Sequence, residues 1–162
     1  MKYESPRLAW LIAVCSGFAA AQVPATLAVS GDVPSPLVLK ASDLAAMPRV
    51  TASVDESDGT KVVYEGVLLR EVLKRAGAPG ELRGKALTSY VVAKARDGYQ
   101  VVFTLAELDP EFGNARILVA DKRNGSTLDG TQGPFRLVCA NDHAGARSVR
   151  MLESLELVRL VK

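Results

Sequence analysis

The amino-acid sequence predicts a single, strand-rich domain of the mixed α+β class. Short stretches that alternate apolar and polar residues outnumber the helical patterns. They also do not alternate steadily with helices, as the strands of a doubly wound α/β fold would. A length of 162 residues, with 48% hydrophobic residues, suits one hydrophobic core. The fold class therefore rests on pattern, order and size together.

The N-terminus has the features of a signal peptide covering residues 1–21. Lys2 and Arg7 supply the positive start, an apolar run covers 8–14, and three alanines at 19–21 precede a cleavage point before Gln22. The apolar run is shorter than the roughly 20 residues that a membrane span needs. We therefore expect a periplasmic or secreted domain, residues 22–162, with no membrane span after signal removal. Cys139 would be its only thiol, so no internal disulfide is expected.

The first half of the mature chain is divided by clear turn residues. Alternation predicts a strand over 27–30, which Gly31 and the prolines at 34 and 36 end. Ser42 or Asp43 can cap a short helix over 44–47, which Pro48 stops. Strands over 50–54 and 61–67 flank the polar turn "DESDG" at 55–59, which predicts a hairpin.

A helix is predicted over 67–76, and strands dominate after it. Apolar residues recur at helical spacing, lysine and arginine fill the last turn, and Gly77 then Pro79 end the helix. Strands are predicted over 86–95, 99–105, 115–121, 135–140 and 151–161. Between them lie a turn at 96–98, a turn or short helix at 106–112, a turn at 122–125 and a Gly-rich loop at 128–134.

Charge and motif spacing exclude several classes of function. The 20 basic and 18 acidic residues leave a net charge of +2, too small for a duplex-binding surface. The acidic turn lacks the ligand spacing of a calcium loop, so we interpret it as a solvated hairpin tip. The Gly-rich loop lacks the Gly-Lys-Ser/Thr of a phosphate-binding P-loop. We expect no nucleic-acid partner.

Cationic and hydrogen-bonding side chains gather around the loop that follows the strand at 135–140. Guanidinium groups and backbone N–H groups can hold an anion together, so this loop is a candidate site for a small anionic ligand. Exposed arginines that only raise solubility are an equal alternative. The candidate binding residues are Arg136, Asn141, His143, Arg147, Ser148 and Arg150.

Cys139 and His143 raise the question of a metal or nucleophilic site. Two such ligands are too few for a structural zinc site, and a Cys-His pair also needs a third, orienting group. Because Cys139 continues an apolar strand, we interpret it as a buried core residue. We therefore predict neither a metal ligand nor a catalytic residue.

Five motifs occur in the order found in a known family. They are "LAVSGDVPSPLVLKASDLAAMP", "YEGVLLREVLKRAG", "ARDGYQVVFTLAEL", "ILVADKRNGSTLDGTQGPFRLV" and "HAGARSVRMLESLEL". Together they resemble the molybdopterin-binding domain of the sulfite oxidase family, from about residue 27 to residue 160. The chain is most similar to small exported versions of that domain that stand alone.

The resemblance implies a molybdenum-ligating cysteine between the first two motifs, and this chain has none there. The corresponding stretch is "RVTASVDESDGTKVVYEGV", so a metal would have to accept oxygen from Ser53, Asp55 or solvent. The loop after Cys139 matches the family's pterin-side loop. If a cofactor is bound, the resemblance implies molybdopterin, but we expect none.

Two functional hypotheses follow. The first is a non-catalytic module that binds a small anionic ligand, a pterin or a periplasmic protein partner. The second is a molybdopterin-dependent oxidoreductase with an atypical metal shell, or with a site that a partner subunit completes. The sequence leaves open whether the protein is an enzyme, although the missing cysteine favours the first hypothesis.

Overall fold

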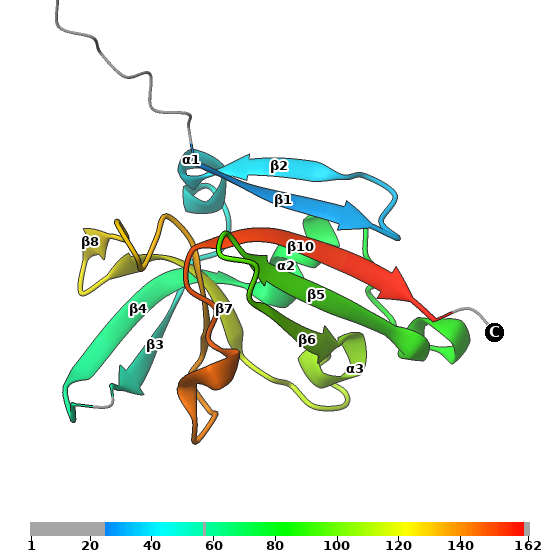
Figure 1. Ribbon diagram of the computed structural model, residues 1–162. Coiled ribbons are helices and arrows are strands. Elements are labelled where there is room, and N and C mark those ends of the chain that lie inside the picture. Colours follow the sequence, from blue (N-terminus) through cyan, green and yellow to red (C-terminus); the bar gives the residue numbers. More distant parts are fainter. Residues whose placement is uncertain (1–24, 57, 161–162) are drawn as a thin grey trace, which may run out of the picture.

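The computed structural model describes residues 25–56 and 58–160, which form a strand-rich α+β domain (Figure 1). The mixed α+β class is confirmed. The predicted signal peptide lies outside the described residues. The elements are β1 (Thr26–Gly31), β2 (Leu37–Lys40), α1 (Ala41–Ala45), β3 (Val50–Asp55), β4 (Lys61–Leu68), α2 (Leu69–Arg75), η1 (Gly84–Thr88), β5 (Ser89–Ala95), β6 (Gln100–Thr104), α3 (Leu105–Leu108), β7 (Ile117–Arg123), β8 (Ser126–Thr127), β9 (Arg136–Cys139), η2 (Gly145–Arg147) and β10 (Leu152–Arg159).

The first sheet joins the two ends of the described chain. Its strand order is β2-β1-β10-β5-β6, with β1 parallel to β10 and every other neighbouring pair antiparallel. At the end of β1 the backbone of Gly31 passes so close to β10 that a Cβ there would lie 2.1 Å from the Leu157 carbonyl oxygen. Glycine at this position therefore permits the contact between the first and last strands.

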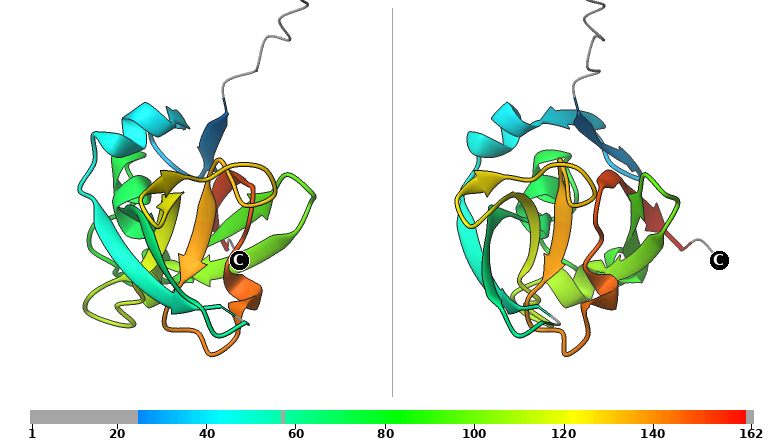
Figure 2. Two further views of the ribbon diagram at one scale, coloured as in Figure 1. Left: turned by 90° about the vertical axis from the view of Figure 1, so that its left-hand side faces the viewer. Right: turned by 60° about the vertical axis from the view of Figure 1, so that its left-hand side comes forward.

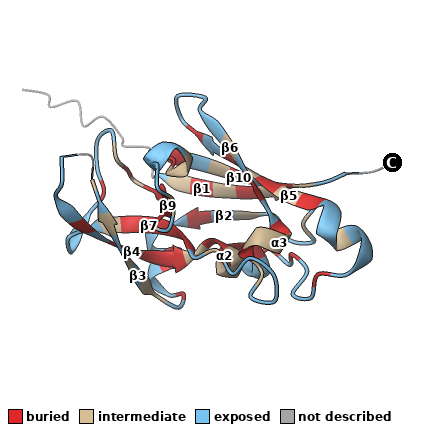
Figure 3. Ribbon diagram, turned by 90° about the horizontal axis from the view of Figure 1, so that it is seen from below, coloured by how far each residue is buried: buried red, intermediate tan, exposed pale blue. Residues whose placement is uncertain are grey.

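The second sheet curves strongly and has apolar residues on both faces. Its strand order is β3-β4-β7-β8, and β9 pairs with β7. In Figure 2 the strands β3, β4, β7 and β9 follow one another around this curve. Val119 and Leu137 belong to the large core shared with the first sheet, whereas Leu118 and Val138 belong to a smaller core on the opposite face. Buried segments consequently line both sheets (Figure 3).

Several predicted boundaries were wrong by a few residues. Val67 and Leu68 are the end of strand β4, and helix α2 begins only at Leu69. They continue a strand that pairs with β7, and this pairing overrides the helical spacing. Residues 86–88 belong to η1, not to a strand, so β5 starts at Ser89. The predicted hairpin of β3 with β4 is confirmed.

The helices also differ in position from the prediction. Helix α1 covers Ala41–Ala45 and not 44–47, and Lys40 is its N-cap residue. The carboxylate of Asp43 accepts a hydrogen bond from the Lys40 backbone N–H over 2.8 Å, so Asp43 supports the start of the helix from inside it. Helix α3 starts at Leu105, where Thr104 accepts a hydrogen bond from the Glu107 N–H.

Two short strands were not predicted. Strand β2 has only four residues, and it is an edge strand held by pairing with β1. Strand β8 has two residues and pairs with the end of β7. Neither is long enough to show a periodic pattern in the sequence. In the described ranges, no helix has the length and apolar character to cross a bilayer.

Candidate functional site

Strand β9 and the segment that returns to β10 position the predicted ligand-binding residues. The Leu137 N–H donates to the Val149 carbonyl over 2.8 Å, and the Cys139 N–H donates to the Ser148 hydroxyl over 3.1 Å. The chain therefore runs out along β9 and back beside it. This arrangement brings Arg136 and Arg150 to one end and leaves the loop 140–147 at the other.

Arg136 is buried among polar side chains from three segments. Its Nη1 donates to the Tyr64 hydroxyl over 2.6 Å and to the Gln132 side-chain oxygen over 2.5 Å. The guanidinium also lies over the Tyr64 ring, 4.8 Å from the ring centroid. The Glu56 carboxylate is 3.8 Å from Nη1 and accepts a hydrogen bond from the Tyr64 hydroxyl over 2.7 Å.

The charges around Arg136 are unevenly balanced. Burial, together with the positive charge of Arg150 nearby, lowers the pKa of the Arg136 guanidinium. Burial and the Glu56 carboxylate raise the pKa of Tyr64, while the charges of Arg136 and Arg123 oppose that rise. Three guanidinium groups thus act on a region that holds one carboxylate. The Arg136 Nε–H is also buried without a hydrogen-bond partner among the described residues.

Arg147 belongs to a separate network at the loop end. Its Nε and Nη2 hold both carboxylate oxygens of Asp142 at 2.7 and 2.8 Å, and its Nη1 donates to Glu107 over 2.6 Å. The guanidinium also lies 5.2 Å from the centroid of the Phe103 ring. These carboxylates raise the pKa of Arg147, with Asp142 contributing most. Arg147 therefore fastens the loop to α3 and β6.

The remaining predicted residues lie along the same loop. Ser148 is partly buried and supports the backbone of β9, whereas Asn141 and His143 are exposed. Of the six predicted binding residues, the structure brings Arg136 and Arg150 together and separates them from the loop tip. Their role in binding a ligand stays a prediction for all six.

Sequence reasoning missed three polar residues of the Arg136 site. Gln132 lies in the Gly-rich loop, and Tyr64 has the alternating position of an ordinary strand residue. Glu56 corrects the interpretation of the acidic turn as entirely solvated, because its side chain is only 22% exposed and faces Tyr64. Asp58 in the same turn does remain at the surface, where its carboxylate accepts from Thr60. No local pattern distinguishes the two acids.

Cys139 occupies a core position. It is 6% exposed, and its Sγ donates to the Arg147 carbonyl oxygen over 3.6 Å. Burial raises the pKa of this thiol to about 12, so it is protonated near neutral pH. Its burial agrees with the interpretation of Cys139 as a core residue.

The residues present fit an anion better than a thiolate-bound metal. The groups around Arg136 offer oxygen and nitrogen atoms only, namely a phenol, a carboxylate and an amide. Among the residues that the structure describes, no cluster of three or more histidine, cysteine or acidic side chains is arranged to hold a metal ion. This donor set does not fit the thiolate-ligated molybdenum of the family, whereas the incompletely paired guanidinium does fit an anionic group.

A cavity of about 320 Å³ adjoins this site. It lies between the β7–β8 hairpin and the loop that follows, and Gln132 lines it while also accepting the hydrogen bond from Arg136. Arg123 lines the same cavity. A ligand in this space could contact Gln132, the residue that accepts the hydrogen bond from Arg136.

Comparisons with known proteins agree with this fold. Residues 20–161 match the family model described as "Oxidoreductase molybdopterin binding domain". No curated protein matches the chain. Among solved structures, the sulfane dehydrogenase SoxCD from Paracoccus pantotrophus matches with a TM-score of 0.64 and 19% identity, over 84% of this chain but only 39% of that chain. The family match covers nearly the whole sequence and confirms the resemblance noted from the motifs. The chain therefore belongs to the oxidoreductase molybdopterin-binding domain family.

Proposed function

We propose that this domain is an exported, non-catalytic binding module that holds a small anionic ligand at Arg136 and Arg150. The ligand can be a free anion, the anionic part of a pterin, or an acidic group on a periplasmic protein partner. The observation that carries the proposal is the buried Arg136 guanidinium, which keeps an unpartnered Nε–H beside a second arginine.

An anion would relieve two costs at this position. A buried donor without a partner costs about 1–3 kcal/mol, and two neighbouring guanidinium groups repel each other. The Glu56 carboxylate offsets part of this charge but lies 3.8 Å from Arg136 Nη1, beyond hydrogen-bond distance. A ligand oxygen between Arg136 and Arg150 would accept from both groups. Charge-assisted bonds of this kind are the strong ones in proteins.

The first test replaces Arg150, because it is exposed and its loss should not disturb the core. With inorganic phosphate as the probe in calorimetry, we expect Arg150→Ala to weaken binding about tenfold, as the loss of one charged hydrogen-bond donor implies. Arg116→Ala is the matched control, since Arg116 is an exposed arginine just before β7. Equal phosphate affinity in both variants, or no phosphate binding by the unmodified domain, would remove the proposal.

The second candidate is a molybdopterin-dependent oxidoreductase with an atypical metal shell or a site completed by a partner subunit. Membership of the molybdopterin-binding family favours it. The lack of a cysteine in residues 49–67, where the resemblance implies one, opposes it, because oxygen donors differ electronically from a thiolate.

Elemental analysis separates the two candidates. The protein should be purified from its own exporting host and assayed for molybdenum and for released oxidised pterin. Near-stoichiometric amounts of both would favour the oxidoreductase, and a folded sample with neither would favour the binding module. The same sample tests export: Trp10 is the only tryptophan, so cleavage before Gln22 should remove all tryptophan fluorescence and lower the mass accordingly.

A further inference from the structure

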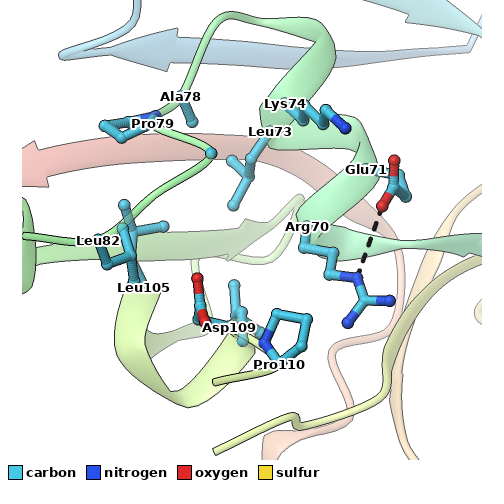
Figure 4. A pocket seen from close by; sticks show the side chains of 12 residues that line it. Arg70, Glu71, Leu73, Lys74, Ala78, Pro79, Leu82, Leu105, Asp109 and Pro110 are labelled. Carbon is cyan, nitrogen blue, oxygen red and sulfur yellow. Dashed lines mark ion pairs between the residues drawn. The ribbon is translucent and has the colours of Figure 1, made fainter. Parts of the chain in front are cut away.

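A second cavity lies between helices α2 and α3, and it shares no lining residue with the Arg136 site (Figure 4). Its volume is about 210 Å³. For comparison, an apolar cavity of roughly 150 Å³ can hold benzene. The space therefore suits a ligand of about eight to ten non-hydrogen atoms.

The inner wall of this cavity is apolar. Four leucines from α2, from the segment after it and from α3 form the wall, and each is at most 8% exposed. They are Leu73, Leu82, Leu105 and Leu108. A branched aliphatic group in this space would bury its apolar surface against these leucines, which favours binding.

Four charged residues line the same space: Arg70, Glu71 and Lys74 on α2, and Asp109 just after α3. The Asp109 carboxylate follows α3 and, in Figure 4, points toward the space beneath Leu73. One of its oxygens, Oδ1, accepts a hydrogen bond from the Glu111 N–H over 2.8 Å, which orients the carboxylate. Arg70 lies across the cavity on α2.

Arg70 keeps donors available for a ligand. Its Nε is 3.5 Å from the Glu71 carboxylate, and its Nη1 donates to the Asn114 side-chain oxygen over 3.2 Å. A guanidinium has five N–H groups, so these two contacts orient the side chain without using all of its donors. An anionic group on a ligand could bind the remaining ones.

We propose that this cavity binds a small zwitterionic α-amino acid with a branched aliphatic side chain. The ammonium group lies against Asp109, the carboxylate against Arg70, and the side chain contacts the leucine wall. Each of the three parts of such a ligand meets the surface that its chemistry requires. A ligand with only one charge would bind through Arg70 or Asp109 but not through both.

The test compares three ligands of nearly the same shape. Calorimetry on the unmodified domain would measure free leucine, isocaproate, which lacks the ammonium group, and isoamylamine, which lacks the carboxylate. We expect free leucine to bind at least tenfold more tightly than either analogue. Equal binding of the three ligands, or no binding of leucine, would overturn the proposal.

Variants assign each charge to its residue. Asp109→Asn keeps the Oδ1 acceptor for Glu111 but loses the charge. It should therefore weaken the binding of leucine at least tenfold and leave the affinity for isocaproate unchanged. Arg70→Gln should weaken the binding of leucine and leave the affinity for isoamylamine unchanged. Arg75→Gln is the control, because Arg75 is an exposed charge at the end of α2 that does not line the cavity. An effect of Arg75→Gln as large as that of Asp109→Asn would refute the assignment, and thermal unfolding would confirm that each variant is folded.

Discussion

At the scale of single residues, Gly31 shows how one atom can decide whether two strands meet. Its φ is +91°, and a Cβ there would lie 2.1 Å from the Leu157 carbonyl oxygen. We predict that Gly31→Ala lowers the free energy of unfolding by about 3 kcal/mol or more, combining left-handed strain with a backbone clash. Gly98 has a φ of +89° with open space around it, so Gly98→Ala should cost only about 1 kcal/mol. Urea unfolding of both variants measures the difference, and equal losses would contradict it.

At the scale of elements, Asp142 and Arg147 tie the loop after β9 to α3. The hydrogen bonds from Arg147 lower the pKa of Asp142 in the folded protein. A carboxyl group whose pKa is lowered by folding stabilises the folded protein at pH values above its ordinary pKa of about 3.9. That stabilisation is lost as the pH falls through the pKa of the group in the folded protein.

Asp142→Asn should therefore lower the free energy of unfolding by about 1 kcal/mol near neutral pH, a modest value because Arg147 is 41% exposed. At about pH 3 the difference from the unmodified domain should shrink toward zero. Urea unfolding at the two pH values measures it. Asp129→Asn, an exposed carboxylate in the Gly-rich loop, is the control and should show little change at either pH. A loss for Asp142→Asn that does not depend on pH would contradict the role of its charge.

At the scale of the whole molecule, the two cores share the same strands. Leu137 packs into the large core and Val138 into the smaller one, and both lie on β9. Strand β9 contributes side chains to both cores, so unfolding of one core would expose the other. We therefore predict one cooperative unfolding transition. Leu137→Ala should lower the free energy of unfolding by about 3 kcal/mol without splitting that transition. Circular dichroism and tyrosine fluorescence should report one midpoint, and two midpoints would show independent units.

The sequence predicted most elements, and it failed where pairing competes with local pattern. Turn residues and alternation located the hairpin of β3 and β4 and the long strands β5 and β10. Val67 and Leu68 satisfy both a helical and a strand pattern, and pairing with β7 decided for the strand. The motif order also identified the family correctly, because it combines five segments that are each weak alone.

The sequence likewise predicts only part of the candidate site, and the tertiary structure determines the rest. By itself, the sequence determined the strand-rich α+β class, the family, the arginine-rich loop and the absence of a cysteine from residues 49–67. Tertiary structure alone decided that Arg136 is buried against Tyr64 and Glu56, while Arg147 is engaged by two carboxylates. The reason is physical: residue type and spacing determine which side chains can bear charge, but Tyr64 is 72 residues away from Arg136 and Glu107 is 40 away from Arg147. Only the packing of the sheets brings those atoms together.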